Sequence, residues 1–94
     1  MADMTRRIVC AAVRAENGDV IVGIRHYSTD MHYQIRNRPD GRRFENRHDD
    51  DQGFVNTWGE YLTRKEAYAV ALANGQIIRP EACPGEVLYS EGLY

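Results

Sequence analysis

An Asn-Gly pair between two short apolar runs constrains the fold of this chain more than any other feature. The run Ile8–Arg14 (IVCAAVR) precedes the pair and Val20–Arg25 (VIVGIR) follows it, and both are rich in β-branched residues, which favour strands. Asn17 and Gly18 supply the positive φ angles of a tight turn, so the sequence predicts a β-hairpin. Apolar residues occupy both faces of each run. We therefore expect a helix on one face of the sheet and another subunit on the other.

A second, shorter hairpin is predicted in the second half of the chain. Gly53–Asn56 (GFVN) and Glu60–Leu62 (EYL) are its strand candidates, and Trp58-Gly59 forms a plausible turn between them. The clearest helix follows directly. Thr63 and a glutamate three residues later form a capping-box pattern at its start, and an Asn-Gly pair ends it after an alanine-rich body, 64–73.

These elements predict the fold class. We expect one α+β domain over residues 1–94: a small antiparallel sheet of hairpins with one or two C-terminal helices packed on it. The tail Val87–Tyr94 (VLYSEGLY) is amphipathic, so it should pack against the rest of the molecule. A domain this short buries little apolar surface alone, which makes a homo-oligomer the expected state.

The segment Tyr27–Gln52 differs from the rest of the chain because it is polar and rich in arginine. Its guanidinium groups belong to Arg36, Arg38, Arg42, Arg43 and Arg47. Asp30 could begin a short helix that runs to Asn37, but the apolar pattern there is sparse. We expect a loop or insertion, partly solvated, of the kind that is either mobile or functional. The role of its arginines is left open.

Charge and composition exclude several classes of protein. The formal net charge is −2, which argues against a coat for long nucleic acids, since such a coat needs a basic surface. No apolar run approaches the length of a membrane span, and the N-terminus lacks the apolar stretch of a signal peptide. We expect a cytoplasmic protein. Cys10 and Cys83 are interpreted as buried thiols rather than a disulfide framework.

The residue patterns of known catalysts are missing. The opening strand and hairpin superficially resemble Nudix hydrolases, but the helix lacks the clustered glutamates that hold magnesium on a pyrophosphate. His26, His32 and His48 do not show zinc-ligand spacing, and the aspartate run Asp49–Asp51 is usually a solvated surface feature. No serine stands in a nucleophile-elbow context. We expect no enzyme, no catalytic residue, no metal and no cofactor.

What remains favours binding of an anionic ligand. Of the 12 basic residues only Lys65 is lysine, which reflects either genome composition or bidentate recognition of phosphate by guanidinium groups. Arg25 and His26 end the second strand. Either both point into a cleft, or Arg25 pairs with an acidic residue and His26 lies on the surface. Arg64 lies in the first helical turn, where its charge opposes the helix dipole and a partner or ligand would offset the cost.

Three further residues are candidate ligand contacts, and two of them carry two interpretations each. Phe54 is either a core residue or a platform on which a base stacks. Asn56 either reads a base edge or ends a strand, and Arg79 is held extended by Pro80, where it could reach a ligand.

Together these motifs resemble a known family. A VCAAV-type strand, an Asn-Gly turn, IVGIRH, DQGFVNTWGEYLTRKEAYAVALANGQI and a final YSEGLY are similar to the first-described bacteriophage anti-Thoeris sponge proteins. The resemblance covers most of the chain and is weakest over 27–51. Those proteins sequester cyclic ADP-ribose isomers made by bacterial Thoeris immunity. Some also bind cyclic oligonucleotides of CBASS immunity at separate sites.

The resemblance implies a small-molecule cyclic nucleotide ligand, held without cleavage at a subunit interface of a homodimer or homohexamer in the infected bacterial cytoplasm. Phe54 would stack on the base, Arg79 would contact the pyrophosphate, and Arg25 would contact cyclic oligonucleotide phosphates. Asn56 and Arg64 carry over less directly. Thr63-Arg64 departs from the polar pattern expected near the helix start. The arginine-rich segment also has no counterpart we can place, and it motivates an alternative: a protein-interaction inhibitor that docks on an acidic host protein.

Overall fold

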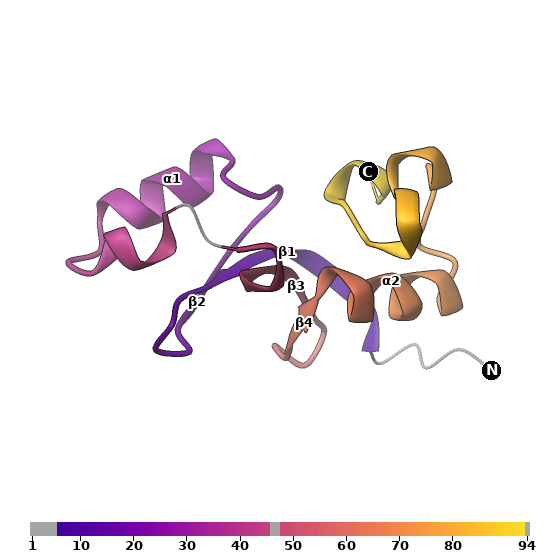
Figure 1. The fold of residues 1–94 in the computed structure, drawn as a ribbon, viewed down its shortest axis with the longest axis horizontal. Coiled ribbons are helices and arrows are strands. Elements are labelled where there is room, and N and C mark those ends of the chain that lie inside the picture. Colours follow the sequence, from indigo (N-terminus) through magenta and orange to yellow (C-terminus); the bar gives the residue numbers. More distant parts are fainter. Residues whose placement is uncertain (1–5, 46–47, 94) are drawn as a thin grey trace.

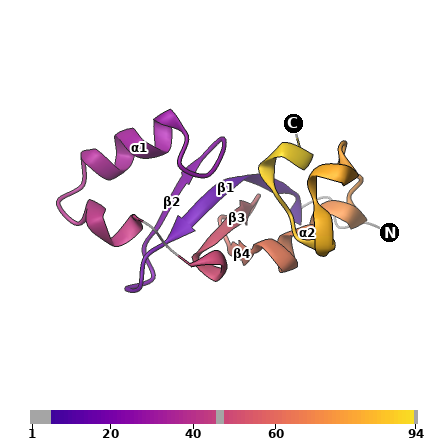
Figure 2. The same ribbon diagram turned by 45° about the horizontal axis from the view of Figure 1, so that its top comes forward.

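The computed structural model describes residues 6–45 and 48–93 and contains a four-stranded antiparallel sheet in the order β2-β1-β3-β4. The strands are β1 (Ile8–Arg14), β2 (Val20–Gly23), β3 (Gln52–Asn56) and β4 (Tyr61–Thr63), and the α-helices are α1 (Thr29–Arg36) and α2 (Arg64–Ala73). The sheet occupies the middle of the molecule, with α1 towards one end and α2 towards the other (Figures 1 and 2). The predicted α+β class is confirmed. None of the described helices is long and apolar enough to span a membrane.

The first predicted hairpin is present, but its turn differs from the predicted type. Gly18 has a φ of 91°, whereas Asn17 is not among the described residues with positive φ. The Gly18 amide donates to the Ala15 carbonyl (2.9 Å), and the Ala15 amide donates to the Asp19 carbonyl (2.8 Å). This is a three-residue loop in which a type I turn is followed by a left-handed glycine. The strand after it ends at Gly23, two residues earlier than predicted.

The second hairpin repeats this construction. Gly59 has a φ of 77°, its amide donates to the Asn56 carbonyl (3.0 Å), and the Asn56 amide donates to the Glu60 carbonyl (3.1 Å). Both loops therefore depend on one glycine at the left-handed position, where a side chain would be strained.

Helix α2 forms as the capping pattern predicts. The Thr63 side chain accepts from the Glu66 amide (3.3 Å), and the Glu66 carboxylate accepts from the Thr63 amide (2.9 Å). At the other end Gly75 has a φ of 65°, and the Gln76 amide donates to the Ala71 carbonyl (2.9 Å). This is a Schellman motif, which satisfies carbonyls that the helix end leaves free.

The arginine-rich segment is more helical than the predicted loop. The short helix considered between Asp30 and Asn37 is present as α1, with Ser28 rather than Asp30 as its N-cap. Met31 and Ile35 of α1 are buried, as is Phe44 in the short 3-10 helix Gly41–Phe44. They pack on Val13 of β1 in a second hydrophobic cluster. A single i, i+4 apolar pair thus suffices to dock α1 because the hairpin provides the rest of the core.

Several arginines of this segment hold its structure together. The Arg38 guanidinium lies 4.8 Å from the centre of the Phe44 ring and donates to Asp40 (2.8 Å) and Asp19 (3.2 Å). Arg43 pairs with a glutamate of the first hairpin loop, at 3.2 Å. Arg36 and Arg42 are exposed, and Arg47 lies outside the described residues.

The two hydrophobic clusters lie side by side on one face of β1. Ala11 belongs to the cluster under α2, and Val13 belongs to the cluster under α1. Residues two apart in a strand point to the same face, so both helical layers cover that face. On the opposite face Val22, which pairs with Ala12, remains 39% exposed.

The C-terminal segment packs against the domain, as predicted for its described part. It forms 3-10 turns at Pro80–Ala82, Pro84–Glu86 and Ser90–Gly92. Leu88 is fully buried in the cluster under α2, and Ser90 is 2% exposed. The residue that ends the tail, Tyr94, lies outside the described residues.

Candidate anion-binding site

Arg64 is fixed at the start of α2 by three contacts. Its Nη1 donates to the Leu88 carbonyl (3.3 Å) and its Nη2 donates to Gln52 Oε1 (3.1 Å), while the guanidinium lies 4.5 Å from the centre of the Tyr89 ring. The Leu88 amide in turn donates to the Arg64 carbonyl (3.0 Å). These contacts hold the guanidinium in one place before any ligand arrives, so little side-chain entropy remains to be lost on binding.

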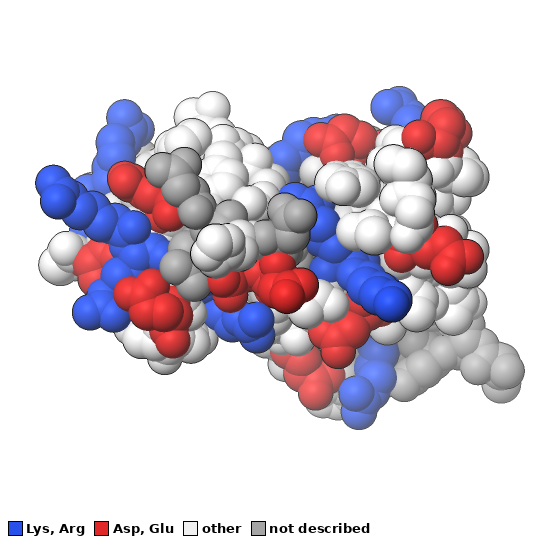
Figure 3. Space-filling model, viewed as in Figure 1, with Lys and Arg blue, Asp and Glu red and all other residues white. Residues whose placement is uncertain are grey.

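A pocket of about 210 Å³ opens beside this guanidinium. Its lining consists of Asp50, Thr63, Arg64, Lys65, Val87 and Tyr89. Arg64 and Lys65 bring positive charge to it, which the carboxylate of Asp50 and the capping carboxylate of Glu66 partly offset. Figure 3 shows lysine and arginine side chains between the two halves of the molecule, with acidic side chains beside them.

Arg25 approaches the same C-terminal segment from the connection between β2 and α1. Its Nη1 donates to Ser90 Oγ (3.4 Å) and lies 3.7 Å from Glu91 Oε1. The Arg25 and Glu91 side chains are 39% and 60% exposed, so the ion pair is accessible to water and weak. An anion with more charge than one carboxylate could displace Glu91.

His26 is half-buried, and the charges of Arg64 and Glu91 both act on its ring. Its Nε2 is 2.7 Å from the Gly53 carbonyl, and because a carbonyl only accepts, Nε2 donates. The ring meets Phe54 edge-on, with centroids 5.2 Å apart. Burial, followed by the charge of Arg64, lowers the pKa of His26 to about 4, against the raising effects of Gly53, Ala12 and Glu91.

This lowered pKa predicts a pH dependence of stability. Between pH 6.5, the ordinary pKa of histidine, and about 4, the unfolded chain binds a proton at His26 that the folded chain does not. The free energy of unfolding should therefore fall as the pH drops through this window. Urea denaturation at pH 7 and pH 5.5 measures the difference. His26→Asn should shrink it and the control His32→Gln should leave it intact; an unchanged difference in the first variant would contradict the assignment.

Three residues proposed from sequence thus come together. Arg64 contacts residues 88 and 89, Arg25 contacts residues 90 and 91, and His26 feels the charges of both Arg64 and Glu91. In the strand order, β2 and β4 are the two edges of the sheet, and Arg25 follows the first while Arg64 follows the second. The C-terminal segment, which both arginines contact, connects them.

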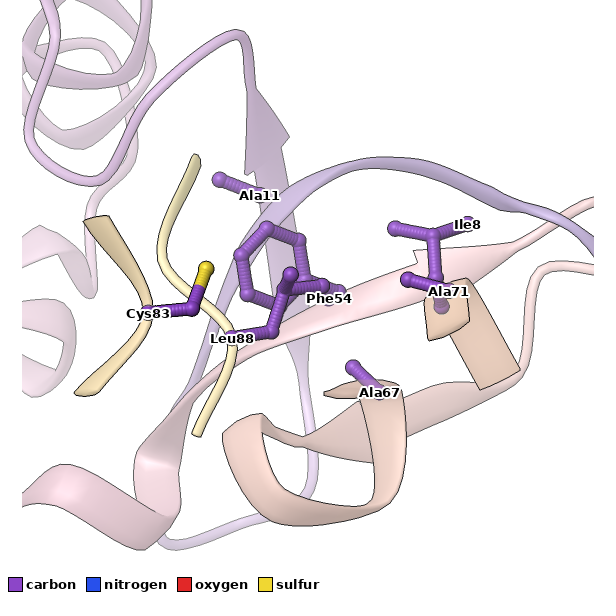
Figure 4. Close-up of a cluster of buried hydrophobic side chains, with 7 residues drawn as sticks. All are labelled: Ile8, Ala11, Phe54, Ala67, Ala71, Cys83 and Leu88. Carbon is purple, nitrogen blue, oxygen red and sulfur yellow. The ribbon is translucent and has the colours of Figure 1, made fainter. Parts of the chain in front are cut away.

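Phe54 corrects one expectation from sequence. Its side chain is fully buried and packs with Ala11, Ala67 and Leu88, as Figure 4 shows. With no ring surface exposed, Phe54 offers no platform for a base in this structure. Of the two interpretations that the sequence left open, the structure places Phe54 in the core.

Asn56 and Arg79 lie apart from the Arg64 pocket. The Asn56 Oδ1 accepts from the Trp58 amide (2.9 Å) and the Glu60 amide (3.0 Å), and its Nδ2 donates to Glu60 Oε1 (2.8 Å). Asn56 is 5% exposed, so its amide organises the second hairpin loop rather than reading a base edge. Arg79 is exposed at the start of the 3-10 turn Pro80–Ala82 and does not line the pocket.

Two residues of the aspartate run make contacts within the protein. Tyr61 Oη donates to the Asp50 carbonyl (2.7 Å), and Asp51 pairs with Arg14 (3.3 Å). Within residues 6–45 and 48–93, no group of three or more His, Cys, Asp and Glu side chains is arranged to hold a metal ion.

Comparison with known proteins identifies the family. The sequence model described as phage T4 y16D protein matches residues 7–94. The chain belongs to this phage protein family. No curated protein and no solved structure matches it. The family description gives a phage origin and names neither a ligand nor an activity, so the chemistry of this family member rests on its own residues.

Sequence reasoning missed the residues that position Arg64. Gln52 opens a strand, and Leu88 and Tyr89 lie 24 and 25 positions after the arginine they contact. Only the tyrosines of the amphipathic tail gave any signal, because they suggested that the tail packs on something. The identity of its partner depends on long-range packing, which no local pattern encodes.

Proposed function

We propose that this phage protein binds a cyclic nucleotide immune signal and sequesters it without cleaving it. Cyclic ADP-ribose isomers are the first candidate ligands, and cyclic oligonucleotides are the second. The observation that supports this proposal most is the convergence of Arg25 and Arg64 on residues 88–91, beside Tyr89. The motifs shared with anti-Thoeris sponges and the phage family point in the same direction.

The chemistry of this cluster suits phosphate. A guanidinium group offers paired N–H donors that match two phosphate oxygens, and such charge-assisted bonds are about twice as strong as neutral ones. Lys65 adds a further positive charge in the first turn of α2, at the N-terminal end where the helix dipole favours anions. The half-buried His26, with its lowered pKa, remains neutral at pH 7, so the positive charge of the cluster comes from the arginines.

A ligand must compete with two carboxylates for the arginines. Glu91 occupies Arg25 in the free protein, and Asp50 lies at the Arg64 pocket. A phosphate ligand must displace or outweigh these carboxylates. Ligands with two or more phosphate charges are therefore favoured over monoanions, and added salt should weaken their binding.

The size of the pocket supports an assembly of several subunits. Its 210 Å³ is smaller than the roughly 300–1,000 Å³ of most small-molecule sites, so one subunit encloses only part of a dinucleotide-sized ligand. Val9, Val22 and Ile24 expose apolar surface near the uncovered sheet face. We propose a homodimer or homohexamer whose subunit contacts cover this surface and complete the ligand enclosure, in the cytoplasm of the infected bacterium.

Isothermal titration with a panel of cyclic ADP-ribose isomers and cyclic trinucleotides tests the proposed function. After each titration the protein is heated and the ligand is analysed by chromatography. We expect saturable binding and intact ligand. Conversion of the ligand to a product would contradict sequestration. If no panel member released heat, the exposed arginines Arg36 and Arg42, and the hypothesis of a protein-interaction inhibitor, would become the next subject of mutation.

A further inference from the structure

A second pocket, of about 320 Å³, lies in the other half of the molecule, beside α1. It is lined by Tyr27, His32, Ile35 and Glu45. None of these residues lines the Arg64 pocket or contacts residues 88–91 through a hydrogen bond or ion pair described above. The volume reaches the lower end of the range for small-molecule sites.

The backbone at Tyr27 is held in an unusual conformation. Its φ is 55°, a left-handed value that bulky residues rarely adopt. The Tyr27 amide donates to Met31 Sδ (3.1 Å) and the Tyr27 hydroxyl donates to the Phe44 carbonyl (2.8 Å). Tyr27 is therefore held both at its backbone amide and at its side-chain hydroxyl. Such strain persists only where the surroundings enforce it, and it is concentrated at functional sites.

The lining presents aromatic and acidic groups together. The Tyr27 and His32 rings form adjoining walls, with centroids 5.9 Å apart and planes tilted by 41°. The buried Ile35 supplies an aliphatic surface, and Glu45 supplies a carboxylate. Of the described residues that line the pocket, none is a lysine or an arginine. The guanidinium of Arg38 is instead directed to Phe44 and Asp40.

We propose that this pocket binds a small organic ammonium group. The face of an aromatic ring carries negative electrostatic potential that attracts cations, and a nearby carboxylate adds a Coulombic attraction. A methylated ammonium group also has apolar surface, which suits Ile35 and the two rings. This site would be distinct in ligand chemistry from the anion-binding cluster, and its occupation does not depend on the function proposed for that cluster.

Choline and its uncharged isostere 3,3-dimethylbutan-1-ol provide a direct test. They share one shape and differ in the positive charge, so any difference in binding reports the electrostatic contribution. Each compound is titrated into ¹⁵N-labelled protein at pH 8 and constant ionic strength, and amide signals are followed by NMR. We expect choline to shift the signals of Tyr27, His32 and Glu45 saturably. The isostere should bind roughly three- to tenfold more weakly.

Two variants make the test specific. Glu45→Gln removes the charge of an exposed side chain and should weaken choline binding about threefold or more. Glu81→Gln removes an equally exposed charge from the C-terminal segment and should change nothing. The proposal is overturned if choline causes no saturable shifts at these residues, if the isostere binds as tightly, or if Glu45→Gln binds choline like the native chain.

Discussion

Replacing Phe54 with alanine is expected to lower the free energy of unfolding by about 3–5 kcal/mol. The Phe54 ring is fully buried between the sheet, α2 and the C-terminal segment, and its removal leaves a cavity that surrounding side chains fill only in part. Domains of this size are stable by about 5–15 kcal/mol in total, so the variant should be barely folded. Urea denaturation followed by circular dichroism measures the change.

A milder replacement separates the core role of Phe54 from a role in ligand stacking. Phe54→Leu retains most of the apolar volume and should cost on the order of 1–2 kcal/mol. Its affinity for the tightest ligand of the calorimetric panel should remain within a few-fold of the native value. The control Trp58→Ala truncates a side chain that is 66% exposed and should change stability by no more than about 0.5 kcal/mol. A folded Phe54→Leu protein that had lost binding would restore the stacking interpretation.

The second large effect is expected at Arg64. Arg64→Gln removes the positive charge that Tyr89, Gln52 and the Leu88 carbonyl hold in place. Because hydrogen bonds to charged groups contribute about 1.5–3 kcal/mol, affinity for the tightest panel ligand should fall roughly 10- to 150-fold. Arg64→Lys keeps the charge but loses the planar guanidinium group, so its affinity should lie between that of the native chain and that of Arg64→Gln.

Matched controls test whether this loss is local. Arg43→Gln removes a comparable charge from the arginine-rich segment, where Arg43 pairs with Glu16, and should leave affinity unchanged. Each titration is run below the thermal midpoint of the least stable variant, so that unfolding does not contribute to the result. Native affinity in a folded Arg64→Gln protein would exclude Arg64 as a ligand contact.

The elements that sequence predicted are those with strong local signals. Each hairpin loop has a glycine at the position that requires a positive φ, and α2 has a complete capping box and a terminal glycine. In contrast, α1 has only Met31 and Ile35 as an apolar pair, and its burial depends on Val13 and Phe44. Local pattern indicated this helix only weakly, because the contacts that stabilise it are distant in the sequence.

In the candidate site, too, residue type indicated some features, whereas others depend on contacts that are distant in the sequence. Residue type singled out Arg25, His26 and Arg64 among the candidate ligand contacts, and the structure places these three near the C-terminal segment. Residue type alone could not separate Phe54 the core residue from Phe54 the platform, because an aromatic side chain suits both. The outcome depended on whether Leu88 returned to cover the ring, which is a property of the whole fold.

The central claim is that Arg25 and Arg64 hold the ligand. The measurement that tests it most directly is an NMR titration that follows the guanidinium Nε–H signals of all arginines while the tightest panel ligand is added. We expect saturable shifts at Arg25 and Arg64 and none at Arg43, with the affinity found by calorimetry. Saturable shifts confined to other arginines, with Arg25 and Arg64 unmoved, would contradict the claim and place the ligand elsewhere on the molecule.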